Sequence, residues 1–119
     1  MRPVNFTEKF EQIGEYWTPY IVGELNGQYV KLAKLKGEFV WHSHAEEDEM
    51  FTVIKGSLKI EFEEGAVYLE EGEMCVVPKG TRHKPVAIEE CHVMLFEPKS
   101  TAHTGEVVSE LTVQNQKWL

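Results

Sequence analysis

The sequence predicts an all-β fold, a sandwich or barrel, preceded by a short N-terminal helix. Short runs of alternating apolar and polar residues recur about every 8–12 residues, and turns containing glycine separate them. The clearest run places Leu58, Ile60 and Phe62 on one face and polar residues on the other. Such alternation buries one face of each strand and leaves the other wet, as in an antiparallel sheet.

The helix is predicted over residues 4–14. Asn5 is a candidate N-cap, and Glu8 follows three residues later, which is a capping-box pattern. Gly14 is suited to ending the helix. The apolar residues fall on one helical face, which predicts packing against the outside of the barrel: Phe6, Phe10 and Ile13. We expect the helix and a connector to occupy residues 1–19.

The barrel is predicted over residues 20–97. It opens with a hairpin of strands 20–25 and 28–35, joined at Asn26-Gly27, because both turn residues tolerate positive φ. Lys36-Gly37 is expected to turn the chain into a further extended run, 38–42. The later strands are expected at 49–54, 57–62, 66–69, 73–77, 83–88 and 91–97.

The pattern is lost over residues 98–119. This stretch is predicted to be a C-terminal tail, with residues 107–119 forming a strand or an extended segment on the barrel or on a partner. We expect residues 1–119 to form one domain, a length sufficient to bury a single core.

Three histidines and one glutamate are the candidate functional residues. His42 and His44 lie two residues apart, so their side chains share one face of an extended segment. Glu49 opens the next strand and projects to the same side as Phe51. His83 follows a Pro-Lys-Gly turn further along the chain. Imidazoles and a carboxylate on one inward face suit a divalent transition metal ion.

The spacing of these residues resembles the two sequence motifs of the cupin superfamily. The first reads Gly37-x4-His42-x-His44-x4-Glu49-x6-Gly56, and the second reads Gly72-x5-Pro78-x-Gly80-x2-His83. The gap after Gly37 is one residue shorter than the usual pattern, and Ala87 stands where the second motif commonly has Asn. The resemblance implies a double-stranded β-helix, or jelly-roll barrel, in which His42, His44, Glu49 and His83 hold one metal ion.

The expected ligand set does not select the metal. Fe, Mn, Ni, Cu and Zn all accept imidazole and carboxylate ligands. A set without cysteine differs from most structural zinc sites, which use thiolates. Four protein ligands leave one or two positions open on a five- or six-coordinate ion, and water, dioxygen or a chelating substrate can fill them.

The rest of the pocket is expected to be largely apolar, which suits a small organic molecule anchored through the metal. Inward strand positions predict its wall: Val40, Phe51, Val53, Leu58 and Ile60. No further acid or base is evident inside the barrel. His92 and His103 are interpreted as surface or packing residues, Arg82 as a surface residue, and the acidic loop 45–48 as solvated.

Composition excludes several classes of function. The formal net charge is −8, so the chain would repel nucleic acid. No apolar run approaches the roughly 20 residues of a membrane helix, and the N-terminal residues lack the apolar core of a signal peptide. A cytoplasmic location is expected. The two cysteines, Cys75 and Cys91, are expected to be reduced packing residues.

Three functions remain open at this point. The first is a metal-dependent enzyme acting on a small oxygen-bearing substrate, with dioxygenation or isomerisation as the reactions that the resemblance implies. The second is a non-catalytic cupin that binds or senses a small molecule, and the third is a scaffold with a structural metal. Catalytic residues are not assigned. A homodimer is expected, formed through the edge strand 20–25 or through the C-terminal tail.

Overall fold

Strands dominate the regular secondary structure of the protein. Its computed structural model describes all residues except 106, 108, 110 and 114. The described residues form one helix and eight strands: α1 (Phe6–Glu11), β1 (Tyr20–Leu25), β2 (Gln28–Glu38), β3 (Glu49–Lys55), β4 (Leu58–Phe62), β5 (Gly65–Leu69), β6 (Met74–Val77), β7 (His83–Pro98) and β8 (Lys117–Trp118). No helix in the described part of the chain is long and apolar enough to span a bilayer.

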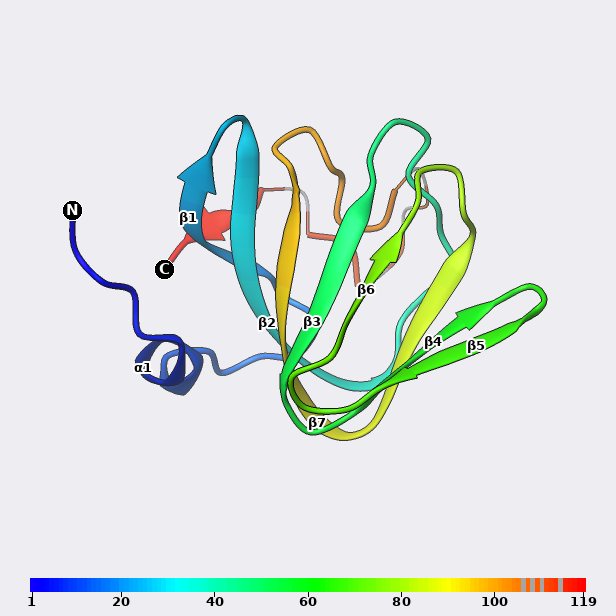
Figure 1. Cartoon of the computed structure of the whole chain (residues 1–119), viewed down its shortest axis with the longest axis horizontal. Helices are drawn as coiled ribbons and strands as arrows, with labels where there is room; N and C mark the ends of the chain where they lie inside the picture. Colours follow the sequence, from blue (N-terminus) through cyan, green and yellow to red (C-terminus); the bar gives the residue numbers. More distant parts are fainter. Residues whose placement is uncertain (106, 108, 110, 114) are drawn as a thin grey trace.

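Strand β7 organises the sheet. It pairs antiparallel with β2 along most of its length, with β4 through its first residues and with β3 through its last. Because β7 bends around the base of the molecule, the strands beside its two halves face each other across an enclosed interior (Figure 1). The sheet curls into a barrel-like shell but does not close, since the hydrogen-bonded path ends at β5 and at β8. The predicted all-β jelly-roll fold with a short N-terminal helix is confirmed.

Two predicted turns are absent. The chain does not turn at Lys36-Gly37, because β2 continues to Glu38, and residues 83–98 form one strand where two were predicted. The pairing register shifts between Leu35 and Gly37, so a bulge accommodates the glycine, whose φ is +86°. Long-range pairing between β2 and β7 thus overrides the local turn signals.

The hairpin turn and the helix follow their sequence signals. Asn26 and Gly27 both have positive φ, at 48° and 77°. The side chain of Asn5 accepts a hydrogen bond from the Glu8 N–H at 3.0 Å, and the helix is shorter than predicted. Phe10 and Ile13 pack on Val22 and Leu32, on the outer side of the sheet. A larger apolar cluster fills the interior.

The C-terminal segment is tied to the first strand. Lys117 and Trp118 pair parallel with Tyr20 and Ile21, and the Leu119 N–H donates to the Ile21 carbonyl at 3.0 Å. Of the segment 107–119 that was predicted as a strand or extended tail, residues 108, 110 and 114 lie outside the described residues. The part that pairs as β8 is only two residues long.

Candidate metal centre

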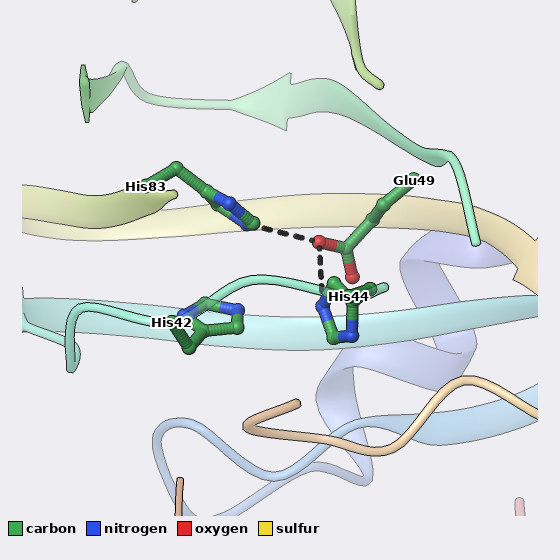
Figure 2. Close-up of side chains that lie close together, drawn as sticks. All are labelled: His42, His44, Glu49 and His83. Carbon is green, nitrogen blue, oxygen red and sulfur yellow. Dashed lines mark hydrogen bonds and ion pairs between the residues drawn. The ribbon is translucent and has the colours of Figure 1, made fainter. Parts of the chain in front are cut away.

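The structure brings the four predicted ligand residues together inside the shell. His42 and His44 lie in the connection between β2 and β3, Glu49 is the first residue of β3, and His83 is the first residue of β7. All four side chains are buried, and one candidate ligand atom from each lies within 4.8 Å of the others. Figure 2 shows the rings of His44 and His83 beside the Glu49 carboxylate, with His42 across from them.

Backbone pairing sets the relative position of two of the histidines. The His42 N–H donates to the His83 carbonyl at 3.0 Å, and the His83 N–H donates to the His42 carbonyl at 2.9 Å. This isolated bridge joins the segment after β2 to the start of β7. The two imidazoles consequently enter the interior side by side, with ring centroids 4.3 Å apart.

Hydrogen bonds fix the orientation of both rings. The Nδ1 of His42 lies 2.9 Å from the Val40 carbonyl, and the Nδ1 of His83 lies 2.9 Å from the Thr81 carbonyl. A carbonyl only accepts, so each Nδ1 carries the proton and each Nε2 keeps its lone pair. Burial, reinforced by the neighbouring His83, lowers the pKa of His42 from 6.5 to about 4, which keeps this imidazole neutral. Neutral imidazoles with a free Nε2 are suited to binding a metal ion.

His44 supplies the test of whether a metal ion fits here. Both of its ring nitrogens are buried and have no hydrogen-bond partner among the described residues. Its Nε2 lies 3.6 Å from the Glu49 carboxylate, beyond hydrogen-bond distance. An unpaired buried polar group costs roughly 1–3 kcal/mol, and a cation at the centre of the cluster would remove this cost for the His44 nitrogen that binds it.

The spacing of the donor atoms also fits a metal ion. Metal–ligand bonds of about 2.1 Å place opposite ligand atoms about 4.2 Å apart. The observed spread of up to 4.8 Å is slightly larger, so small inward side-chain movements would complete the coordination. The donor set of three imidazoles and one carboxylate is therefore compatible with a divalent transition metal.

A second acid lies beside the cluster, which contradicts the expectation that the interior holds no further acid or base. The side chain of Glu97 is buried, and its Oε1 accepts a 2.7 Å bond from the buried Lys31 ammonium. Burial raises the pKa of Glu97 well above its usual value, and the charge of Glu49 adds to this effect. Burial acts in the same direction on Glu49, but its interactions with Glu97 and with the cluster histidines hold the Glu49 pKa well below its usual value.

The cavity beside the cluster is small, about 30 Å³, which is room for one or two water molecules. Of the five residues predicted to form its wall, only Phe51 does so, while Val53, Leu58 and Ile60 belong to the packed interior and Val40 packs against it. The actual wall comes largely from other segments: Trp17, Pro19, Ala33, Leu35, Phe39, Pro85, Val93, Leu95, Glu97 and His103. Strand alternation identified inward positions, but not the level of the barrel at which each one lies.

Trp17 and His103 are two of the wall residues that come from segments outside the barrel strands. Trp17, in the connector after α1, stacks on Phe39 with centroids 4.8 Å apart and donates from Nε1 to the Lys36 carbonyl at 2.8 Å. His103 contacts the same Phe39 ring at 5.0 Å, so its interpretation as an ordinary surface or packing residue is incomplete. No periodicity marks either residue in the sequence, since both lie in irregular segments.

The remaining polar candidates lie away from the cluster. His92 stacks on Phe10 outside the barrel, at 4.5 Å, and contacts Glu90 at 2.7 Å. Arg82 is exposed, lies over the Trp41 ring and is 3.8 Å from Glu63. Asp48 in the acidic loop accepts a hydrogen bond from the Lys79 N–H at 2.8 Å.

The segment after β7 packs directly on the loop that carries the two histidines. Gly105 has φ +60°, and a Cβ added to it would lie 2.0 Å from the carbonyl oxygen of Ser43, which stands between His42 and His44. We expect Gly105→Ala to displace this segment, because neither backbone can absorb such a clash and the conformation itself disfavours alanine. Faster protease cleavage and faster hydrogen exchange within residues 101–105 would report the displacement.

The matched control for this prediction is Gly27→Ala. Gly27 also has a positive φ, 77°, but an added Cβ would meet nothing within 4 Å. This variant should lose only roughly 1 kcal/mol of folding free energy, the cost of placing alanine in the left-handed conformation. Equal protection of residues 101–105 in Gly105→Ala and in the wild type would contradict the tight packing.

His103 makes the stability of the metal-free protein depend on pH. Burial, followed by the nearby Lys31 charge, lowers the pKa of His103 from 6.5 to about 4. As the pH falls, His103 therefore becomes protonated in the unfolded chain at a higher pH than in the folded protein. The folded state is not penalised by His103 above pH 6.5, and it loses stability relative to the unfolded chain as the pH falls towards 4. Compared with His103→Gln, the wild type should lose about 1 kcal/mol more per pH unit within that window. Urea titrations in the presence of a chelator measure the difference, and parallel pH profiles would refute it.

A protein family and several solved structures are similar to this chain. A family profile described as "Cupin_2: Cupin domain" matches residues 28–99. A cupin-2 domain protein of Shewanella frigidimarina, known from its crystal structure, is 47% identical and has a TM-score of 0.80; the match covers 81% of this chain and 94% of that one. Protein NMB1881 of Neisseria meningitidis is 32% identical with a TM-score of 0.76, covering 82% of this chain and all of that one.

A curated relative adds no assigned activity. The uncharacterized protein YdbB of Bacillus subtilis is 34% identical over 74 residues, which are 61% of this chain and 66% of that protein. The chain thus matches slightly less than two thirds of that relative's length.

Proposed function

This chain belongs to the cupin family, and from that premise we propose that it is a metal-dependent enzyme acting on a small oxygen-bearing organic substrate. His42, His44, Glu49 and His83 would hold one divalent ion, Fe, Mn, Ni, Cu or Zn. The observation that carries the proposal is the buried donor cluster, above all His44, whose two ring nitrogens have no protein partner among the described residues. The ion would act as a Lewis acid towards a substrate oxygen.

The chain's own residues supply the surroundings of this chemistry. The Val40 and Thr81 carbonyls hold the His42 and His83 rings in one orientation. Trp17 and Phe39 form an apolar wall that limits water beside the cluster. Glu97 places a second carboxyl group next to Glu49. These features support chemistry at a metal-centred site with limited water, and the reaction that we propose there is of the dioxygenase or isomerase type.

The test begins with metal content. The purified protein should contain about one transition metal ion per chain by elemental analysis. The loaded protein is then offered a panel of diols, hydroxy acids and enolisable ketones, with oxygen consumption and isomer formation followed in parallel. A protein that stays metal-free after exposure to each of the five divalent ions would refute the proposal.

A non-catalytic small-molecule cupin is the second candidate. The cavity of about 30 Å³ does not separate it from the enzyme, because a substrate and a merely bound ligand would both need the wall to move before they reach the cluster. Metal-dependent retention of a small molecule through purification, without turnover of that molecule or of the substrate panel, would support this candidate over the enzyme.

A cytoplasmic homodimer remains part of the proposal. Strand β1, one of the edges predicted to mediate dimerisation, is partly covered by β8 along Tyr20 and Ile21. The other end of the sheet is β5, which carries the exposed side chains of Val67 and Tyr68. Analytical ultracentrifugation measures the oligomeric state, and cell fractionation measures the compartment.

A further inference from the structure

The segment after β7 contributes a polar group to the metal cavity. His103 lines the inner cavity together with His42, Glu49 and Glu97. It also lines a larger outer hollow of about 360 Å³, whose wall includes Tyr29, Lys99 and Gln116. His103 is the residue that these two linings share, so it stands between the solvent-facing hollow and the cluster.

The hydrogen bonding of His103 determines which of its nitrogens can bind a ligand. The Val113 N–H donates to Nδ1 at 2.8 Å. Because Nδ1 accepts this bond, the proton of the neutral ring lies on Nε2. The hydrogen bond that the structure gives for the His103 ring involves Nδ1 and not Nε2. His103 thus offers one N–H donor, whereas His42 and His83 turn lone pairs towards the interior.

Packing against Phe39 and the anchoring of the surrounding segment set the position of the ring. The ring contacts Phe39, which in turn contacts the metal-candidate residue His42 at 5.4 Å. The close approach of Gly105 to Ser43 holds the segment against the histidine-bearing loop. Such support from packed neighbours is what a ligand-binding side chain needs in order to keep its geometry.

We propose that His103 is a ligand-binding residue of the metal site, donating from Nε2–H to an acceptor atom of the molecule bound at the metal. The inference rests on the proposed metal function and adds a substrate class to it. The ligand would be a small molecule or anion with two acceptor atoms, one for the metal and one for His103. Carboxylates and vicinal oxygen compounds have this character, whereas a molecule with a single donor atom would gain nothing from His103.

Azide is a suitable probe, because one terminal nitrogen binds a divalent metal and the other accepts a hydrogen bond. The protein is loaded with Co²⁺, metal content is measured by elemental analysis, and the azide dissociation constant is obtained from the visible spectrum of the cobalt. Two variants separate the ring nitrogens. His103→Asn retains an acceptor near the Nδ1 position but no donor near Nε2, whereas His103→Gln places an amide N–H near Nε2 and loses the acceptor.

We expect His103→Asn to weaken azide binding about tenfold or more, the contribution of a hydrogen bond to a charged group. His103→Gln should bind azide nearly as well as the wild type, and both variants should hold cobalt as the wild type does. The matched control is His92→Asn, because His92 also stacks on a phenylalanine but lies outside the barrel; this variant should bind azide normally.

The alternative outcomes are distinguishable. If His103 only anchors the segment through Val113, His103→Gln will be the damaging variant and His103→Asn the tolerated one, which overturns the inference. Equal azide affinity in all variants, or no azide response in cobalt-loaded wild type, also overturns it while leaving metal binding intact. Wild-type protein that takes up no cobalt or other divalent ion refutes the proposed function, and the inference with it.

Discussion

Replacing His83 with alanine is expected to abolish tight metal binding. The His83 ring is fully buried, its Nδ1 is held by the Thr81 carbonyl, and its Nε2 lies 3.4 Å from the Glu49 carboxylate. Loss of a residue that merely orients a ligand typically weakens metal binding about 10–100-fold, so loss of a ligand itself should exceed about 100-fold. Competition with a chromogenic chelator measures the change.

The same variant should lose the stabilisation that the metal provides. A ligand present at about 1,000 times its dissociation constant stabilises the folded state by about 4 kcal/mol. In the wild type, chelation should therefore lower the melting temperature markedly, whereas in His83→Ala it should have little effect. His92→Ala, which removes a histidine outside the barrel, serves as the control. Retention of one tightly bound ion in His83→Ala would exclude the four-residue site.

Replacing Glu97 with methionine is expected to cost about 3–5 kcal/mol of folding free energy, the usual effect of leaving one charge of a buried pair without its partner. The Lys31 ammonium is only 1% exposed and donates to Glu97 at 2.7 Å. Methionine has a similar shape but offers no acceptor to the buried Lys31 ammonium. Urea unfolding of the metal-free protein measures the loss without a contribution from the metal.

The double variant Lys31→Met/Glu97→Met tests whether the loss comes from leaving Lys31 buried without its partner. It removes both charges and fills the same space with apolar groups, which is often neutral or stabilising for buried ion pairs. We expect it to recover most of the stability that Glu97→Met loses. If the double variant is less stable than the single, the pair contributes net stability and its retention needs no functional explanation.

The side on which each site residue lies was predictable from local pattern. The two-residue spacing of His42 and His44 and the position of Glu49 at the start of an alternating run place all three side chains inward, and the structure agrees. The meeting of His83 with these residues was implied only by the cupin resemblance. Local periodicity does not specify which strands pair.

Other parts of the site escaped sequence analysis. Glu97 lies in a predicted strand, but a single glutamate in an alternating run does not reveal that Lys31 on another strand lies within 2.7 Å of it. Trp17 and His103 reach the cavity from irregular segments, where no periodicity gives a direction. The two missed turns have a similar cause, because β2 and β7 extend through local breaking signals when each provides the other's hydrogen bonds.

The sequence by itself determined the β-rich class, the N-terminal helix with its Asn5 cap, the hairpin at Asn26-Gly27 and the inward face of the histidine segment. Each of these depends on neighbours within a few residues, whose geometry is fixed by backbone sterics and side-chain alternation. Only the tertiary structure decided that Lys31 and Glu97 pair beside Glu49, and that His103 lies between the cavity and the outer hollow. These contacts join residues distant in sequence, and they exist only once the shell has folded around them.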